Sequence, residues 1–105
     1  MMSELDQPIE TSAERENALI EALMALKTPE EARAFLVDLL TPSEVKTLAE
    51  RWLVARLLDG TDMPYRSIAE AAGSSTATVT RVARFLKDEP HQGYRLVLDR
   101  LKDQS

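Results

Sequence analysis

The sequence predicts an all-α protein, and two observations carry that prediction. Apolar residues recur three and four positions apart along the chain, which is the spacing of one helix face, and they nowhere alternate over the length of a strand. Helix-start patterns, with Thr three residues before Glu or directly before Pro, recur between the apolar runs. The start signals predict six helices. Because 105 residues can enclose only one core, we expect these helices to form a single domain.

The ends of these helices follow from local signals. Residues 1–10 are polar and acidic and contain Pro8, so we expect a disordered tail there and one helical domain over residues 11–105. The first helix runs to about Lys27, and the third ends at the helix-breaking run 59–62. The six expected starts are Thr11, Thr28, Thr41, Pro64, Ser74 or Ser75, and Pro90.

The third helix is apolar around much of its circumference. Its expected inward stripe is Val45, Leu48, Trp52, Ala55 and Leu58, and Leu53 and Leu57 broaden this face. Val54 adds to the apolar residues around Trp52. A small monomer covers so wide an arc only if its core wraps tightly, so we expect a second subunit to bury it. Trp52 is then a core or interface anchor, and ligand stacking is the alternative role.

Residues 64–87 have the pattern of a helix-turn-helix. Ile68 is expected to face inward from its first helix, and Gly73 supplies the positive φ that the turn needs. Val79 and Val82 are three apart and therefore share the inward face of the second helix. The outward face is small, polar or cationic, as a helix in a DNA major groove requires, although a plain helical hairpin with a glycine turn is the alternative.

This pattern predicts a DNA-binding surface with two kinds of contact. The phosphate contacts are assigned to Tyr65, Arg66, Arg84 and Lys87. The contacts to base edges and thymine methyl groups are assigned to Thr76, Ala77, Thr78 and Thr80. Ser75 and Arg81 complete the predicted surface.

The distribution of charge is compatible with double-stranded DNA as a partner. The chain has a net charge of −5, but residues 1–40 alone carry −6 whereas residues 63–87 carry +3. We therefore expect weak non-specific binding that relies on dimerisation and site contacts. The alternative is a protein-interaction module, such as an antitoxin or a polymerase adaptor, which would not be retained on heparin at low salt.

Other functional classes lack support in the sequence. There is no cysteine, signal peptide or membrane span, so we expect a cytoplasmic protein that associates with the nucleoid when bound to DNA. The lone His91 has no second ligand nearby in sequence and no nucleophile pairs with it. We expect no metal, no cofactor and no enzymatic activity.

Several stretches resemble the tryptophan repressor superfamily. They are 40–44, reading Leu-Thr-Pro-Ser-Glu, and 73–81, reading Gly-Ser-Ser-Thr-Ala-Thr-Val-Thr-Arg. Stretches 48–58 and 75–82 are similar to its YerC/YecD branch of regulators. The resemblance implies a six-helix fold, an intertwined homodimer, and a repressor of a palindromic operator.

The resemblance also implies an effector site, which this chain alters. Arg51 and Arg81 match residues that contact the corepressor's carboxylate and ring, and Thr41 matches a residue at the mouth of that site. Val82 and Phe85 replace a glycine and a serine of the repressor. We therefore expect the indole slot to be filled, the site to be vestigial, and tryptophan not to act as corepressor.

Overall fold

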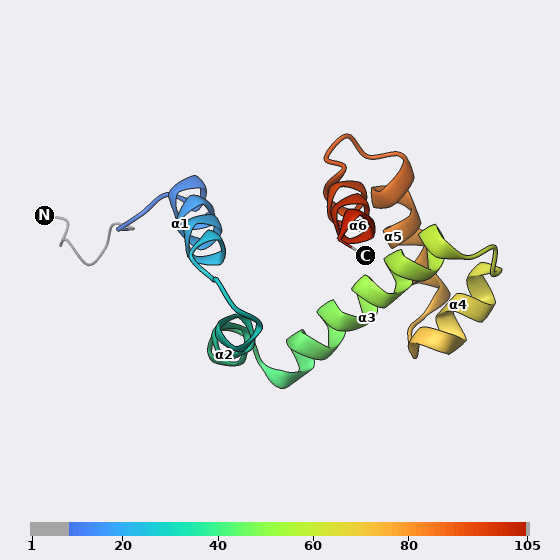
Figure 1. Cartoon of the computed structure of the whole chain (residues 1–105). Helices are drawn as coiled ribbons and strands as arrows, with labels where there is room; N and C mark the ends of the chain where they lie inside the picture. Colours follow the sequence, from blue (N-terminus) through green and yellow to red (C-terminus); the bar gives the residue numbers. More distant parts are fainter. Residues whose placement is uncertain (1–8, 105) are drawn as a thin grey trace, which may run out of the picture. The chain divides into compact units, whose positions relative to one another are not determined.

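The computed structural model describes residues 9–104, and within that range the chain forms helices and no strands, which confirms the all-α prediction. Of the predicted tail, residues 1–8 lie outside the described range, and residues 9 and 10 are exposed. The helices are α1 (Ser12–Met24), α2 (Pro29–Leu39), α3 (Pro42–Gly60), α4 (Tyr65–Ala72), α5 (Thr76–Lys87) and α6 (Gly93–Asp103) (Figure 1).

The chain divides between Thr41 and Pro42 into two compact units. The first contains α1 and α2, and the second contains α3 to α6. The expectation of one domain over residues 11–105 stays a prediction.

The first unit is built on side-chain caps. Thr11 accepts a hydrogen bond from the Glu14 N–H at 3.1 Å, and the Glu14 carboxylate accepts one from the Thr11 N–H at 3.2 Å, as the capping box predicts. Thr28 caps α2 by accepting from the Glu31 N–H at 3.1 Å. Helix α1 ends at Met24 and not near Lys27, because the Lys27 N–H donates to the Glu31 carboxylate of α2 at 2.9 Å and so takes no part in α1.

No residue of α1 or α2 is buried. Leucines and isoleucines of α1 are about half exposed, and Met24 is 80% exposed. So many exposed apolar side chains usually mark a surface that another protein surface covers.

The second unit has its core where α3, α4 and α5 meet, and α5 also packs against α6 (Figure 1). On α3 the buried residues are Val54 and Ala55, whereas Leu48 of the expected stripe is 45% exposed. Ala55 is buried and Trp52 and Leu58 pack against the core as expected, but α4 and α5 pack on a face that also includes Val54 and does not reach Leu48. This core also contains Ile68, Ala69, Ala72, Val79 and Val82, and Ala83, Leu86 and Leu98 are buried as well.

Helix α6 begins at Gly93, three residues after the predicted start at Pro90. Gln92 has a φ of 56°, which is a left-handed conformation incompatible with continuing helix, and its side-chain amide donates to the Glu89 carbonyl at 2.7 Å. Pro90 therefore lies in a turn between α5 and α6.

Ion pairs fix α6 to the end of α3. One oxygen of the Asp59 carboxylate lies 2.9 Å from Arg95 and the other lies 2.7 Å from Lys102. The hydrogen bond from Arg95, followed by that from Lys102, lowers the pKa of Asp59 from 3.8 to about 2. The same bond raises the pKa of Arg95, which also pairs with Asp99 at 3.1 Å.

Candidate nucleic-acid interface

The turn between α4 and α5 has the geometry that the sequence predicts. Gly73 adopts φ 64° and ψ 33°, and its N–H donates to the Glu70 carbonyl at 3.3 Å. The Ser74 N–H donates to the Ala69 carbonyl at 2.9 Å, which completes the C-terminal cap of α4. Ile68 of α4 is fully buried. The two helices are therefore set at a fixed angle by backbone bonds and a shared core.

Helix α5 starts with Ser75 as its cap, so Ser75 and not Ser74 is the capping residue. The Ser75 hydroxyl accepts from the Thr78 N–H at 3.1 Å and lies 3.1 Å from the Thr78 hydroxyl. Thr78 is half-buried, and its contact with a base edge stays a prediction. Its hydroxyl helps to fix the first turn of α5.

The outward face of α5 is exposed along its length. Thr80 is exposed, and its hydroxyl donates to the Thr76 carbonyl at 3.0 Å, leaving the methyl group and the oxygen lone pairs toward solvent. Other exposed residues of the predicted surface are Arg66, Ser75, Thr76, Ala77, Arg81, Arg84 and Lys87, and Tyr65 is 39% exposed. The structure thus brings these predicted residues onto α4 and α5 of one unit.

The cations of this surface lie over aromatic rings. The guanidinium carbons of Arg81 and Arg84 are 4.5 Å and 5.1 Å from the centre of the Phe85 ring. The Lys87 ammonium is 6.0 Å from the centre of the Tyr65 ring. Arg84 also pairs with Glu89 at 3.4 Å. Sequence reasoning missed these contacts, although Arg81 and Phe85 are spaced one helical turn apart and could have indicated one of them.

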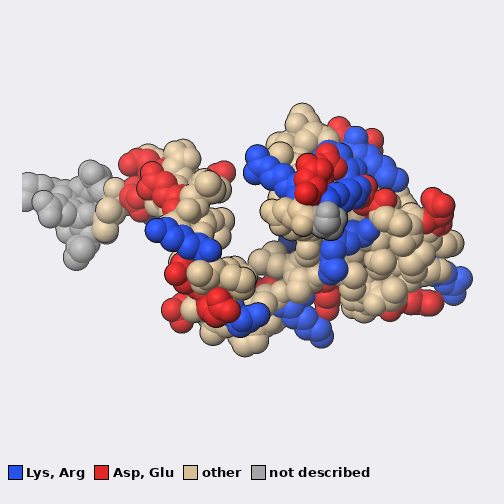
Figure 2. Space-filling view, viewed as in Figure 1, with Lys and Arg blue, Asp and Glu red and all other residues tan. Residues whose placement is uncertain are grey.

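Basic side chains gather over α5 and α6, as Figure 2 shows, whereas acidic side chains prevail over α1. This arrangement follows the uneven charge of the sequence. Since screening limits electrostatic effects to about 10 Å at ordinary salt, the local positive surface matters more to a phosphate than the total charge of −5.

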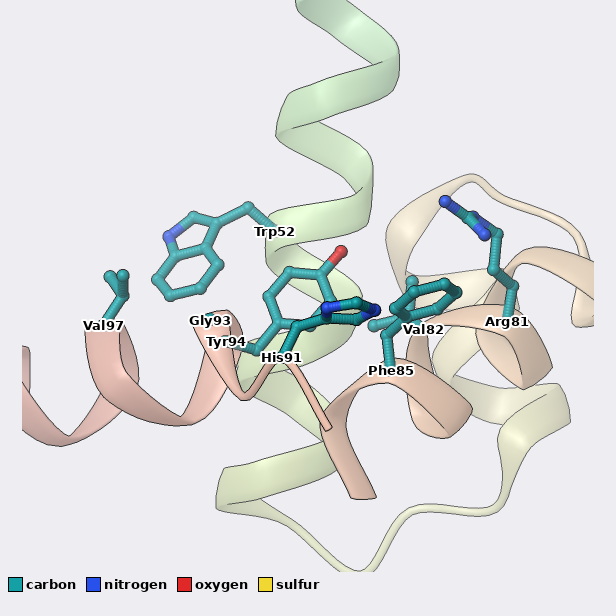
Figure 3. A pocket seen from close by; sticks show the side chains of 8 residues that line it. All are labelled: Trp52, Arg81, Val82, Phe85, His91, Gly93, Tyr94 and Val97. Carbon is teal, nitrogen blue, oxygen red and sulfur yellow. The ribbon is translucent and has the colours of Figure 1, made fainter. Parts of the chain in front are cut away.

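A pocket of about 590 Å³ lies within the second unit, bounded by α3, α5 and the start of α6 (Figure 3). Trp52 and Tyr94 stack at one side with ring centres 6.3 Å apart, and Phe85 and His91 stack with centres 6.1 Å apart. The lining residues are Trp52, Arg81, Val82, Phe85, His91, Gly93, Tyr94 and Val97.

This pocket bears on the predicted effector residues. Arg81, Val82 and Phe85 line it, whereas Arg51 is a half-buried residue of α3 outside the lining, and Thr41 belongs to the other unit. Open volume remains beside Val82 and Phe85, but this pocket does not include Arg51 or Thr41, so the filled indole slot stays a prediction. Val82 is only 1% exposed because its side chain turns into the core, so it leaves open volume next to Phe85.

Residues 9–104 offer no support for a membrane span or a metal site. No helix in this range is long and apolar enough to cross a bilayer. Nor does the range contain a cluster of three or more His, Cys, Asp or Glu side chains that could hold a metal ion.

Comparisons with known proteins agree with this geometry. Residues 14–102 match the family model described as Trp repressor protein. The chain is 39% identical over 85 residues to the uncharacterised protein YerC of Bacillus subtilis (strain 168), covering 81% of this chain and 80% of YerC.

Two solved structures share the fold. A TrpR-like protein from Eubacterium eligens ATCC 27750 matches with a TM-score of 0.76 and 37% identity, covering 90% of this chain and 93% of that protein. A Staphylococcus aureus protein described provisionally as a Trp repressor matches with a TM-score of 0.76 and 31% identity, covering 96% of both chains. The chain therefore belongs to the Trp repressor family, a family of DNA-binding regulators.

Proposed function

We propose that this protein is a transcriptional repressor that binds a palindromic operator as a homodimer, with α5 entering the major groove. The observation that carries the proposal is the division of α5 into two faces. Val79 and Val82 are buried against α3 and α4, while the opposite face exposes small, polar and cationic side chains. A helix in the major groove needs such a face, because base edges are read by short side chains and phosphates by cations.

The DNA-binding proposal is tested with two variants that should behave differently. Thr80→Ala should weaken binding to a site selected from random DNA by about 1–3 kcal/mol and should hardly affect random DNA. Arg84→Ala should weaken both and lower the salt slope by about one unit. Arg100→Ala, which removes an exposed arginine of α6, is the matched control.

The experiment is fluorescence anisotropy over a range of salt concentrations. If Thr80→Ala weakens binding to the selected site and to random DNA equally, Thr80 does not contact a base edge. Absence of salt-dependent binding by the unmodified protein, together with no retention on heparin, would favour the protein-interaction module instead.

The homodimer is supported by the first unit, in which α1 and α2 bury no residue of their own. A second copy would cover these apolar side chains and would place two α5 helices about 34 Å apart, one turn of DNA. Sedimentation should give a dimer at low micromolar concentration, with an unfolding midpoint that rises with protein concentration. A folded monomer at that concentration would rule out the homodimer, and with it the placement of two α5 helices one turn of DNA apart.

Tryptophan independence is the remaining part of the proposal. The Phe85 ring lies 4.5 Å from the Arg81 guanidinium, so an aromatic side chain of the protein already occupies one face of that group. Binding to DNA should then be constitutive or depend on a different effector. The protein would act in the cytoplasm, associated with the nucleoid while bound to DNA, and would need no cofactor or membrane.

A further inference from the structure

Phe85 contacts two of the cations in the proposed DNA-binding surface, and this arrangement suggests a function for its ring. Arg81 precedes Phe85 by four residues, so the two share one face of α5, and the side chain of Phe85 points back toward that earlier turn. The Arg81 and Arg84 guanidinium carbons lie 4.5 Å and 5.1 Å from the ring centre, within the range of a cation–π contact.

The ring is itself held in place. His91, in the turn before α6, stacks on Phe85 with ring centres 6.1 Å apart and planes inclined by 17° (Figure 3). Phe85 is half-buried, and it borders the pocket beside Val82. A ring that is ordered by its contact with His91 can in turn restrict the motion of the arginine side chains that lie against it.

Both arginines are exposed, and Arg81 gains most from such support because Arg84 also pairs with Glu89 at 3.4 Å. An exposed arginine loses side-chain freedom when it binds a phosphate, and that entropy opposes binding. A side chain already ordered against a ring loses less. Lys87 over Tyr65 repeats the arrangement, so three cations of the surface lie over aromatic rings.

We infer that Phe85 is a positioning residue for DNA binding, which holds Arg81 and Arg84 ready to contact phosphates. The inference rests on the proposed function. Phe85 touches no nucleic acid in this scheme and acts only through the two arginines. Its loss should therefore weaken binding to all DNA sequences alike, with no change in the preferred sequence.

The test is a double-mutant cycle on DNA affinity. Phe85→Leu in the unmodified protein should weaken binding about tenfold, because two arginine side chains would then have to be ordered when DNA binds, and Phe85→Tyr, which keeps the ring, should bind like the unmodified protein. The same Phe85→Leu change in a protein carrying Arg81→Ala and Arg84→Ala should have almost no further effect. Measurements at low salt keep the weakest complexes within range.

The result that would overturn the inference is an equal loss in both backgrounds, because Phe85 would then act through packing alone. An unchanged affinity for Phe85→Leu in the unmodified protein would overturn it too. Thermal unfolding of each variant checks folding, and Phe85→Met replaces Phe85→Leu in the same cycle if the leucine protein does not fold. If the unmodified protein binds no DNA, the proposed function is wrong. If it binds DNA and the Phe85 variants bind equally well, only the inference about Phe85 is wrong.

Discussion

Asp59 offers the sharpest test of how the second unit is held together. Its carboxylate lies 2.9 Å from Arg95 and 2.7 Å from Lys102, and its side chain is only 12% exposed. The two partners are on α6, whereas Asp59 is in the last turn of α3. Asp59→Asn keeps the shape of the side chain and removes the charge, so it isolates the electrostatic part of this link.

The size of the effect follows from the pKa of Asp59. The fall from 3.8 to about 2 corresponds to about 2 kcal/mol of preferential stabilisation of the charged form in the folded state. Lys102 is 60% exposed, and water around its ammonium screens the pair. We therefore expect Asp59→Asn to lower the free energy of unfolding by about 1 kcal/mol at pH 7.

The pH dependence has a defined sign. Because the folded-state pKa is lowered, the stabilisation is fully present above the unfolded value of 3.8 and is lost as the pH falls toward about 2. Urea unfolding of both proteins at pH 7 and near pH 3, at one protein concentration, should show the difference shrinking in acid. A difference that is absent at pH 7, or that does not change with pH, would refute the reasoning.

Three further outcomes test other features. Gly73→Ala should lower the free energy of unfolding by about 1–2 kcal/mol, because a φ of 64° is strained for alanine, although its Cβ would meet no atom within 4 Å. Gly73→Asn should cost less, and urea unfolding measures both. Ser75→Ala should cost about 1 kcal/mol by removing the cap of α5, with Ser75→Asp as the control that keeps a cap, compared by thermal unfolding. Millimolar L-tryptophan should leave the unfolding midpoint and the DNA affinity unchanged, whereas calorimetric binding at micromolar concentration would contradict tryptophan independence.

The parts of the fold that depend on local chemistry could be predicted from the sequence. Thr11, Thr28 and Ser75 cap helices because a hydroxyl can accept a bond from an N–H two or three residues further on. Gly73 was predictable because few residues other than glycine adopt a positive φ at a helix end. These interactions involve neighbours in sequence, so the sequence contains both partners.

The parts that depend on tertiary packing were less predictable. Helix α3 is apolar on several faces, so its periodicity could not show that Val54 is buried while Leu48 stays exposed. The start of α6 was misplaced because proline often begins a helix, yet Gln92 turns the chain through a left-handed conformation after Pro90. From the sequence, Asp59 belongs to a segment that ends the third helix. Its ion pairs could not be predicted, because they depend on where α6 packs.

The interpretation of Phe85 changes most between the sequence and the structure. Compared with the repressor family, Phe85 is a bulky replacement for a small residue, and bulk alone predicts a blocked slot. The structure shows open volume of about 590 Å³ beside that ring and two arginines against it. On the inference above, the property of the side chain that matters for DNA binding is its aromatic face, since leucine would fill space almost as well but would offer no negative face to a guanidinium. A helix that supplies this face from its own sequence can order its cations without a bound ligand, and this would account for the constitutive DNA binding that we propose.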